Sequence, residues 1–235
     1  VEARIHQKAP PMDENFFDHL CQLISRIAEV SSENRPAAIQ DALLLMAPEL
    51  ALLQEAESAQ PAPPLSTSVM ARTDQVSHPT AVAPDLNGVL SRFNVPLDED
   101  LQFFVDISTP IEARSRYWQG RTSRLLGLAL AMNQHAGNPI ASEQLAAAVI
   151  LHDLGMAFLP AEMLHGSGSL QALDIERLQS HPQSTYQLLH PMQRWSVAAQ
   201  GVLQHHERVD GNGYPAKLVG DQISSTAKIL SIVDT

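Results

Sequence analysis

Apolar side chains recur at intervals of three or four residues along most of this chain, and no segment shows the convincing alternation that marks a half-buried strand. With 44% apolar and 17% charged residues, the chain has enough apolar surface to bury a substantial core. The single cysteine, Cys21, excludes an intrachain disulfide framework and a zinc site built on cysteines. We therefore predict an all-α fold.

A proline-rich segment divides the chain into two helical parts. Between Ser58 and Pro84 there are five prolines, several Ser, Thr and Ala residues and few large apolar side chains. This composition is typical of a linker between folded regions. We therefore predict a helical N-terminal region at residues 1–57, a linker at 58–85 and a helical domain at 86–235.

The N-terminal region is predicted to form a helical hairpin. Its first helix spans residues 13–30, with Asp13 as the cap. Its second helix runs from Pro36 to about residue 57 and carries one apolar stripe, which Pro48 is expected to kink or split. Two interpretations stay open: a small packing domain, or a regulatory or dimerising module, the latter forming a homodimer through these helices.

Helical spacing continues through the second part of the chain. Ser142 stands directly before an Ala- and Leu-rich stretch and is predicted to cap a buried helix that ends near Asp153. Residues 158–159 and 217–219 allow short extended pieces, but no sheet is expected. Further helices are predicted at residues 97–107, 111–134, 160–164, 172–180, 194–206 and 224 to the end.

Acidic residues are concentrated in the first half of the chain. The formal net charge is −11, yet residues 1–115 carry 7 basic and 17 acidic residues, whereas residues 116–235 carry 8 and 9. The overall charge argues against a DNA-binding protein or one held on an anionic membrane by charge. No apolar run approaches the roughly 18–20 residues of a membrane helix, and no signal-peptide pattern opens the chain. We predict no membrane insertion in this segment and a cytoplasmic location.

Side chains that can bind a metal ion accumulate in the second half. Imidazole nitrogens and carboxylate oxygens are ligands of zinc, iron and manganese. One histidine at a helix end is more often a capping or core residue, but an ordered series of such residues favours a metal centre. A two-metal centre of this type generates hydroxide at neutral pH and stabilises phosphoryl displacement. The candidates are His152, Asp153, His181, His205, His206 and Asp234.

Four segments together resemble the HD-GYP domain, a subgroup of the HD superfamily of metal-dependent phosphohydrolases. They are HDLGMAFLPAEML, the pair His181-Pro182, HHERVDGNGYP and AKILSIVDT, within about residues 116–235. The resemblance implies an HD-type helical bundle at 86–235, preceded by the smaller N-terminal region. It also implies hydrolysis of cyclic di-GMP to linear pGpG or GMP. Because the family's last helix continues further, we expect the domain to extend beyond Thr235.

The resemblance also assigns roles to residues. It makes the six candidates above metal ligands, with Asp153 bridging and with His152 and Asp153 catalytic. The cofactors would be one or two divalent ions, such as iron or manganese, with no organic cofactor. In the family the GYP loop borders the active site and contacts partner proteins. The residues that match this loop are Asp210, Gly211, Gly213, Tyr214 and Pro215.

Three positions depart from the family pattern. Arg121 stands where the family has its first histidine ligand, and an arginine stays protonated and cannot bind metal. We expect Arg121 either to leave one metal short of a ligand or to occupy part of the site as a fixed cation. Met156 replaces a lysine that contacts substrate phosphate, which removes a positive charge. Lys217, after the GYP motif, is a candidate for supplying such a charge to substrate.

Three functions remain open on the sequence. The first is a metal-dependent phosphodiesterase that hydrolyses cyclic di-GMP through an activated hydroxide. The second is a catalytically degenerate domain that acts as a cyclic di-GMP receptor or a protein-interaction module in signalling. The third, hydrolysis of another phosphate ester, is disfavoured by the GYP motif. The acidic front half does not exclude a small bis-phosphate, since residues 116–235 carry a net charge of only −1.

Overall fold

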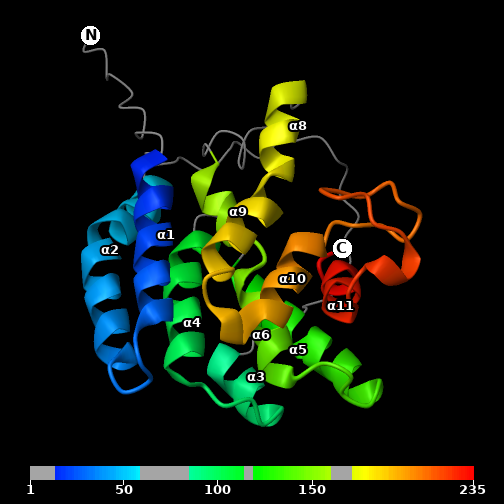
Figure 1. The fold of residues 1–235 in the computed structure, drawn as a ribbon, viewed down its shortest axis with the longest axis horizontal. Helices are drawn as coiled ribbons and strands as arrows, with labels where there is room; N and C mark the ends of the chain where they lie inside the picture. Colours follow the sequence, from blue (N-terminus) through cyan, green and yellow to red (C-terminus); the bar gives the residue numbers. More distant parts are fainter. Residues whose placement is uncertain (1–13, 59–84, 114–118, 160–170) are drawn as a thin grey trace, which may run out of the picture.

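The computed structural model describes residues 14–58, 85–113, 119–159 and 171–235. These residues form helices and no strand, so the predicted all-α fold is confirmed (Figure 1). The α-helices are α1 Glu14–Glu29, α2 Arg35–Ser58, α3 Leu86–Arg92, α4 Glu99–Glu112, α5 Arg121–His135, α6 Ser142–Leu151, α8 Ala172–Gln179, α9 His181–Leu189, α10 Ser196–Gln204 and α11 Ser225–Val233. The 3-10 helices are η1 Leu154–Phe158, η2 Gln193–Trp195 and η3 Gly220–Gln222.

The N-terminal hairpin packs directly on the rest of the protein. Helices α1 and α2 lie side by side along one flank, where α2 contacts α4 and α1 contacts α9 (Figure 1). The rings of Phe16 and Phe17 lie 5.8 and 4.7 Å from that of Phe158, centroid to centroid. The buried apolar residues of the hairpin therefore belong to the same core cluster as those of the following domain. Residues 59–84, most of the predicted linker, lie outside the described residues.

A buried carboxylate joins the hairpin to two other parts of the core. Asp100, on α4, is only 1% exposed, and its Oδ2 accepts a hydrogen bond of 2.9 Å from Nε1 of Trp195. The same oxygen accepts from Arg35 on α2 at 3.2 Å and from Arg194 at 3.4 Å. Because a buried charge is stable only when it is paired, this cluster fixes α2 against α4 and η2.

Some predicted element boundaries are wrong. The helix predicted at residues 111–134 is two helices, because Gly120 has a left-handed φ of 68° and α5 begins only after it. Ser142 is the first residue of α6 rather than its cap, and the cap position belongs to Ala141. Helix α9 was not predicted. Helix α2 is not split, since it runs through Pro48 without interruption. The predicted helix at 160–164 lies outside the described residues.

Three helices end at the same place and bring polar residues there. His152, His205 and Asp234 are the first residues after α6, α10 and α11. The carbonyl end of a helix carries partial negative charge and therefore favours a cation. Helices α10 and α11 approach closely because Gly201 has no side chain: a Cβ there would lie 2.4 Å from Cγ2 of Thr226.

A second close approach places His181. Helix α9 begins at His181, and η1 crosses directly over this residue. A Cβ on Gly155 would lie 2.3 Å from the carbonyl oxygen of His181, so only glycine fits. The amide of Gly155 donates to Oγ1 of Thr185 at 2.8 Å. These contacts hold the start of α9 against the segment that carries His152 and Asp153.

Candidate metal centre

The structure brings the six predicted metal ligands together in two adjacent groups. In each group the ligand atoms all lie within 4.8 Å of one another. The first, the histidine group, is made by His181, His205 and His206. The second, the carboxylate group, is made by His152, Asp153 and Asp234.

Backbone carbonyls fix the orientation of three imidazoles. In each ring Nδ1 lies within hydrogen-bond distance of the carbonyl oxygen three residues earlier. Since a carbonyl only accepts, Nδ1 carries a proton in each ring, and in a neutral ring Nε2 then keeps its lone pair. The pairs are His152 with Val149 at 2.8 Å, His181 with Leu178 at 2.7 Å and His205 with Val202 at 2.6 Å.

The histidine group fits a divalent ion. Nε2 of His181 and Nε2 of His205 are 3.3 Å apart, and both present lone pairs. Two nitrogens at about 2.1 Å from a tetrahedral ion would be separated by about 3.4 Å. Burial lowers the pKa of His181 and of His205, and burial with the neighbouring His181 lowers that of His206 to about 4. All three rings are therefore neutral, the state that binds metal.

A guanidinium already occupies the carboxylate group. Nη1 of Arg121 donates to Oδ2 of Asp153 at 2.7 Å and lies 3.3 Å from Nε2 of His152. Nη2 of Arg121 donates to Oδ1 of Asp234. Burial alone would lower the pKa of Arg121, but the charges of Asp153 and Asp234 raise it. The guanidinium therefore stays charged, and the residues of this group do not fit a second ion while it is there.

Neighbouring charges set the pKa values of the residues in the carboxylate group. Burial would raise the pKa of Asp153, but His152, His181 and Arg121 hold it well below its usual range. Burial would also raise the pKa of Asp234, and hydrogen bonding to His152 lowers it. Burial would lower the pKa of His152, whereas Asp153 and Asp234 raise it to about 10. Both carboxylates are thus anionic.

Asp153 faces both groups. Its Oδ1 is 3.6 Å from Nε2 of His181, and its Oδ2 contacts Arg121 and is 3.1 Å from Nε2 of His152. One carboxylate therefore lies between the histidine group and the guanidinium. The bridging role predicted for Asp153 stays a prediction.

The GYP loop borders the histidine group. The ring of Tyr214 stacks on that of His206, with centroids 4.8 Å apart and planes 27° apart. Gly211 has a left-handed φ of 76°, and a Cβ on Gly213 would lie 2.4 Å from Cα of Glu207. The peptide before Pro215 is cis. Burial, with Asp153 and Asp234, raises the pKa of Tyr214 to about 12, so it remains a phenol.

Glu207, which follows the two histidines, holds this loop and was not predicted to do so. Its carboxylate is buried and accepts from the amides of Ala216 at 2.6 Å and Leu218 at 2.9 Å. A sequence signal did exist: an acidic residue lies between two metal-capable histidines and a glycine-rich loop whose amides need acceptors. Glu207 is therefore a positioning residue for the GYP motif.

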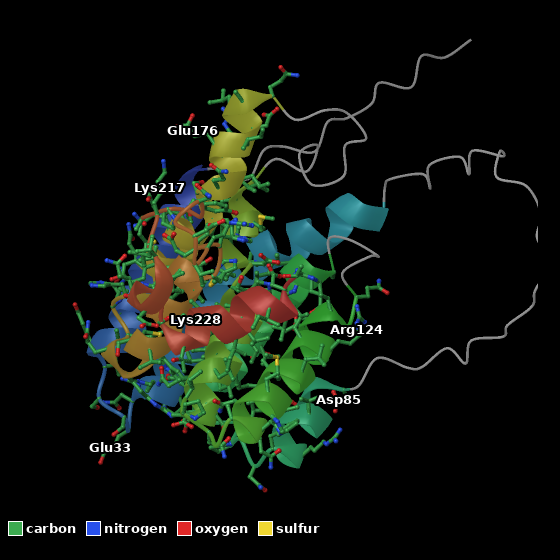
Figure 2. All side chains as sticks on the ribbon, turned by 90° about the vertical axis from the view of Figure 1, so that its right-hand side faces the viewer. Glu33, Asp85, Arg124, Glu176, Lys217 and Lys228 are labelled. Carbon is green, nitrogen blue, oxygen red and sulfur yellow. The ribbon has the colours of Figure 1, made fainter. Side chains whose placement is uncertain are left out.

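The remaining predicted residues lie outside the two groups. Asp210 is exposed, pairs with Arg208 at 2.9 Å and accepts from the amide of Asn212 at 3.0 Å. The bond from Arg208 lowers the pKa of Asp210. Met156 is half-buried in η1. Lys217 is exposed at the outer edge of the molecule (Figure 2), and its predicted contact with substrate stays a prediction.

Replacing Glu207 by alanine is expected to loosen the GYP loop. The amides of Ala216 and Leu218 would lose their acceptor, and each buried unpaired group costs about 1–3 kcal/mol. Hydrogen exchange at these two amides should accelerate by at least about tenfold. Asp221→Ala is the control, because Asp221 is fully exposed on the same segment. Unchanged exchange in Glu207→Ala would contradict the positioning role.

Comparison with known sequences gives the same class of protein. A profile of the HD domain family matches residues 108–235, more than half of the chain. The chain therefore belongs to the HD domain family, and its motifs are those of HD-GYP-type phosphohydrolases, as the sequence predicted. None of the described helices is long and apolar enough to cross a membrane.

Several curated relatives are named for an activity. The cyclic di-GMP phosphodiesterase response regulator RpfG of Xanthomonas campestris is 38% identical over 86 residues, which cover 36% of this chain and 23% of the relative. The cyclic di-GMP phosphodiesterase PA4108 of Pseudomonas aeruginosa is 34% identical over 110 residues, 46% of this chain and 26% of that protein. The 3'3'-cGAMP-specific phosphodiesterase 3 of Vibrio cholerae is 30% identical over 125 residues, 53% and 27%. The chain thus spans about a quarter of the length of these relatives.

Proposed function

We propose that this domain is a metal-dependent phosphodiesterase that hydrolyses cyclic di-GMP. The observation that carries the proposal is the histidine group, in which neutral imidazoles lie beside the anionic Asp153. A divalent ion held there would supply a Lewis acid and lower the pKa of a bound water toward neutrality. Relatives named as cyclic di-GMP and 3'3'-cGAMP phosphodiesterases support a cyclic dinucleotide as the substrate class.

The residues of the chain have separate tasks in this reaction. The anionic Asp153, 3.6 Å from Nε2 of His181, would orient the attacking water by accepting its hydrogen bond. Arg121 would place a fixed positive charge beside the phosphate that reacts. Tyr214 covers one face of His206 and so keeps that ring in place against the GYP loop. The exposed part of that loop remains a candidate surface for partner proteins in signalling.

Two observations favour a second candidate, a receptor for cyclic di-GMP without turnover. Arg121 fills the carboxylate group, and Met156 stands where the family pattern has a phosphate-binding lysine. Both changes would lower the rate of hydrolysis more than the affinity for the nucleotide. The two candidates differ in turnover and share the binding of metal and nucleotide.

The test is metal content and turnover of the purified protein and two variants. We expect the wild type to bind manganese or ferrous iron and to convert cyclic di-GMP to a linear product, followed by chromatography. His206→Gln should lower metal affinity and turnover by about 100-fold or more, because it removes a ligand. His190→Gln, an exposed histidine at the end of α9, is the matched control and should change neither.

Two outcomes would contradict the proposed metal-dependent enzyme. Nucleotide binding without turnover under either metal would favour the receptor. Turnover that survives complete chelation of metal would contradict the metal-dependent mechanism.

A further inference from the structure

We propose that this centre holds one divalent ion, at the histidine group, and that the Arg121 guanidinium permanently takes the place of a second ion at the carboxylate group. This inference rests on the proposed function and deepens it, because it states how many ions the site holds. Its basis is that the ligand atoms of the two groups have different contacts. In the histidine group Nε2 of His181 and Nε2 of His205 present lone pairs 3.3 Å apart, whereas a protein cation already contacts all three members of the carboxylate group.

The first argument concerns the single lone pair of His152. Because Nδ1 lies against the carbonyl of Val149, the neutral ring offers only Nε2 to a ligand. Nη1 of Arg121 lies 3.3 Å from that nitrogen, so in the neutral ring it would donate to that lone pair. If the ring is instead protonated, Nε2 carries a hydrogen. In neither state does His152 offer a metal a free nitrogen.

The second argument concerns the carboxylates. Arg121 donates to Oδ2 of Asp153 and to Oδ1 of Asp234, the same oxygens that lie 3.1 and 3.2 Å from Nε2 of His152. A second ion in this group would need an oxygen of each carboxylate at about 2.0–2.2 Å. It would then lie next to a guanidinium, where two positive charges repel strongly in a partly buried site. An arginine does not lose its proton to relieve this repulsion.

The third argument is that Arg121 is built into this position. It is the first residue of α5, directly after the left-handed Gly120, and α5 packs on α11, which ends at Asp234. Its side chain is 28% exposed. It pairs with Asp153, which directly precedes η1, and with Asp234, which directly follows α11. Two anions from separate segments therefore hold the guanidinium, so Arg121 is a positioning residue for Asp153 and Asp234.

The test is the stoichiometry of Mn²⁺ alone, measured by elemental analysis and electron paramagnetic resonance. We expect one ion per wild-type chain, with the six-line spectrum of an isolated Mn²⁺. Arg121→His removes the cation and adds a ligand, so it should bind two ions whose spectrum shows coupling. Arg121→Gln removes the cation without adding a ligand, and should take up a second ion at least about tenfold more weakly than Arg121→His. Arg124→His, one turn along α5 and exposed, is the control and should stay at one ion.

Circular dichroism and thermal melting identify a variant that does not fold, and Arg121→Gln then carries the test. Two coupled ions per wild-type chain would overturn this inference and leave the proposed function intact. One ion in folded Arg121→His and Arg121→Gln would also overturn it. No ion in any variant would overturn the metal-dependent function itself.

Discussion

Asp100→Ala is expected to lower the free energy of unfolding by about 3–5 kcal/mol, because it breaks a buried ion-pair cluster. The substitution would leave Nε1 of the fully buried Trp195 without its acceptor. It would also leave Arg35, 23% exposed, without the carboxylate that it contacts. An unpaired buried donor and an unpaired, partly buried charge both destabilise the folded state.

Urea denaturation followed by tryptophan fluorescence measures this effect. Asp106→Ala is the matched control on the same helix. Asp106 accepts a hydrogen bond from the side chain of Gln102 one turn earlier, and its loss should change stability by about 0.5 kcal/mol or less. Asp100→Asn keeps an acceptor for Trp195 and loses the charge, so its loss should be intermediate. A loss below about 1 kcal/mol for Asp100→Ala would show that the cluster does not hold α2 on the domain.

Gly155→Ala is expected to destabilise the protein by about 3 kcal/mol and to weaken metal binding as well. The new Cβ would lie 2.3 Å from the carbonyl oxygen of His181 and 2.9 Å from its Cα, so backbone must move. Because His181 is a proposed ligand and begins α9, that movement displaces Nε2. Loss of ligand orientation typically weakens metal binding by about 10–100-fold.

The matched control is Gly127→Ala in the interior of α5. Its nearest neighbour would be Cγ1 of Val89 at 3.9 Å, an ordinary contact. Alanine there should stabilise the protein by about 0.5–1 kcal/mol, because it restricts the unfolded chain. Thermal melting and manganese titration of both variants provide the measurement. Equal melting temperatures for the two would refute the close approach at Gly155.

Most of the residues that meet at the centre could be predicted because their signals are local. His152 and Asp153 stand together at the end of an apolar helix, and His205 and His206 stand together before a glycine-rich loop. These local patterns identify candidates without knowledge of the fold, and their ordered series, rather than any one of them, indicates a metal centre. The resemblance to the HD-GYP domain then supplied the order, and the family is confirmed.

The break between α4 and α5 could not be predicted from apolar spacing. Helix α4 runs through the gap between the helices predicted at 97–107 and 111–134, with Pro110 buried inside it, where packing outweighs the lost backbone hydrogen bond. Gly120 does not interrupt the apolar spacing. Its left-handed φ marks the start of α5 at Arg121, and tertiary contacts decide that start. Tertiary contacts, rather than local preference, set these boundaries.

The roles of Glu207 and Asp100 depend on distant partners. Glu207 accepts from amides 9 and 11 residues later, and Asp100 accepts from groups 65, 94 and 95 residues away. An acidic residue in the sequence carries no sign of such partners, because most acidic residues are solvated. Their burial becomes evident only when the helices are placed.

The contact between Arg121 and Asp234 spans 113 residues of sequence and joins the first turn of α5 to the end of α11. Through Asp153 the same guanidinium also reaches the segment after α6, so three distant parts of the domain meet on one covalently attached cation. An ion at the histidine group would connect only the start of α9 with the end of α10. The histidine group would therefore depend on the metal that the cell supplies. The carboxylate group would be held together by Arg121, a part of the protein itself.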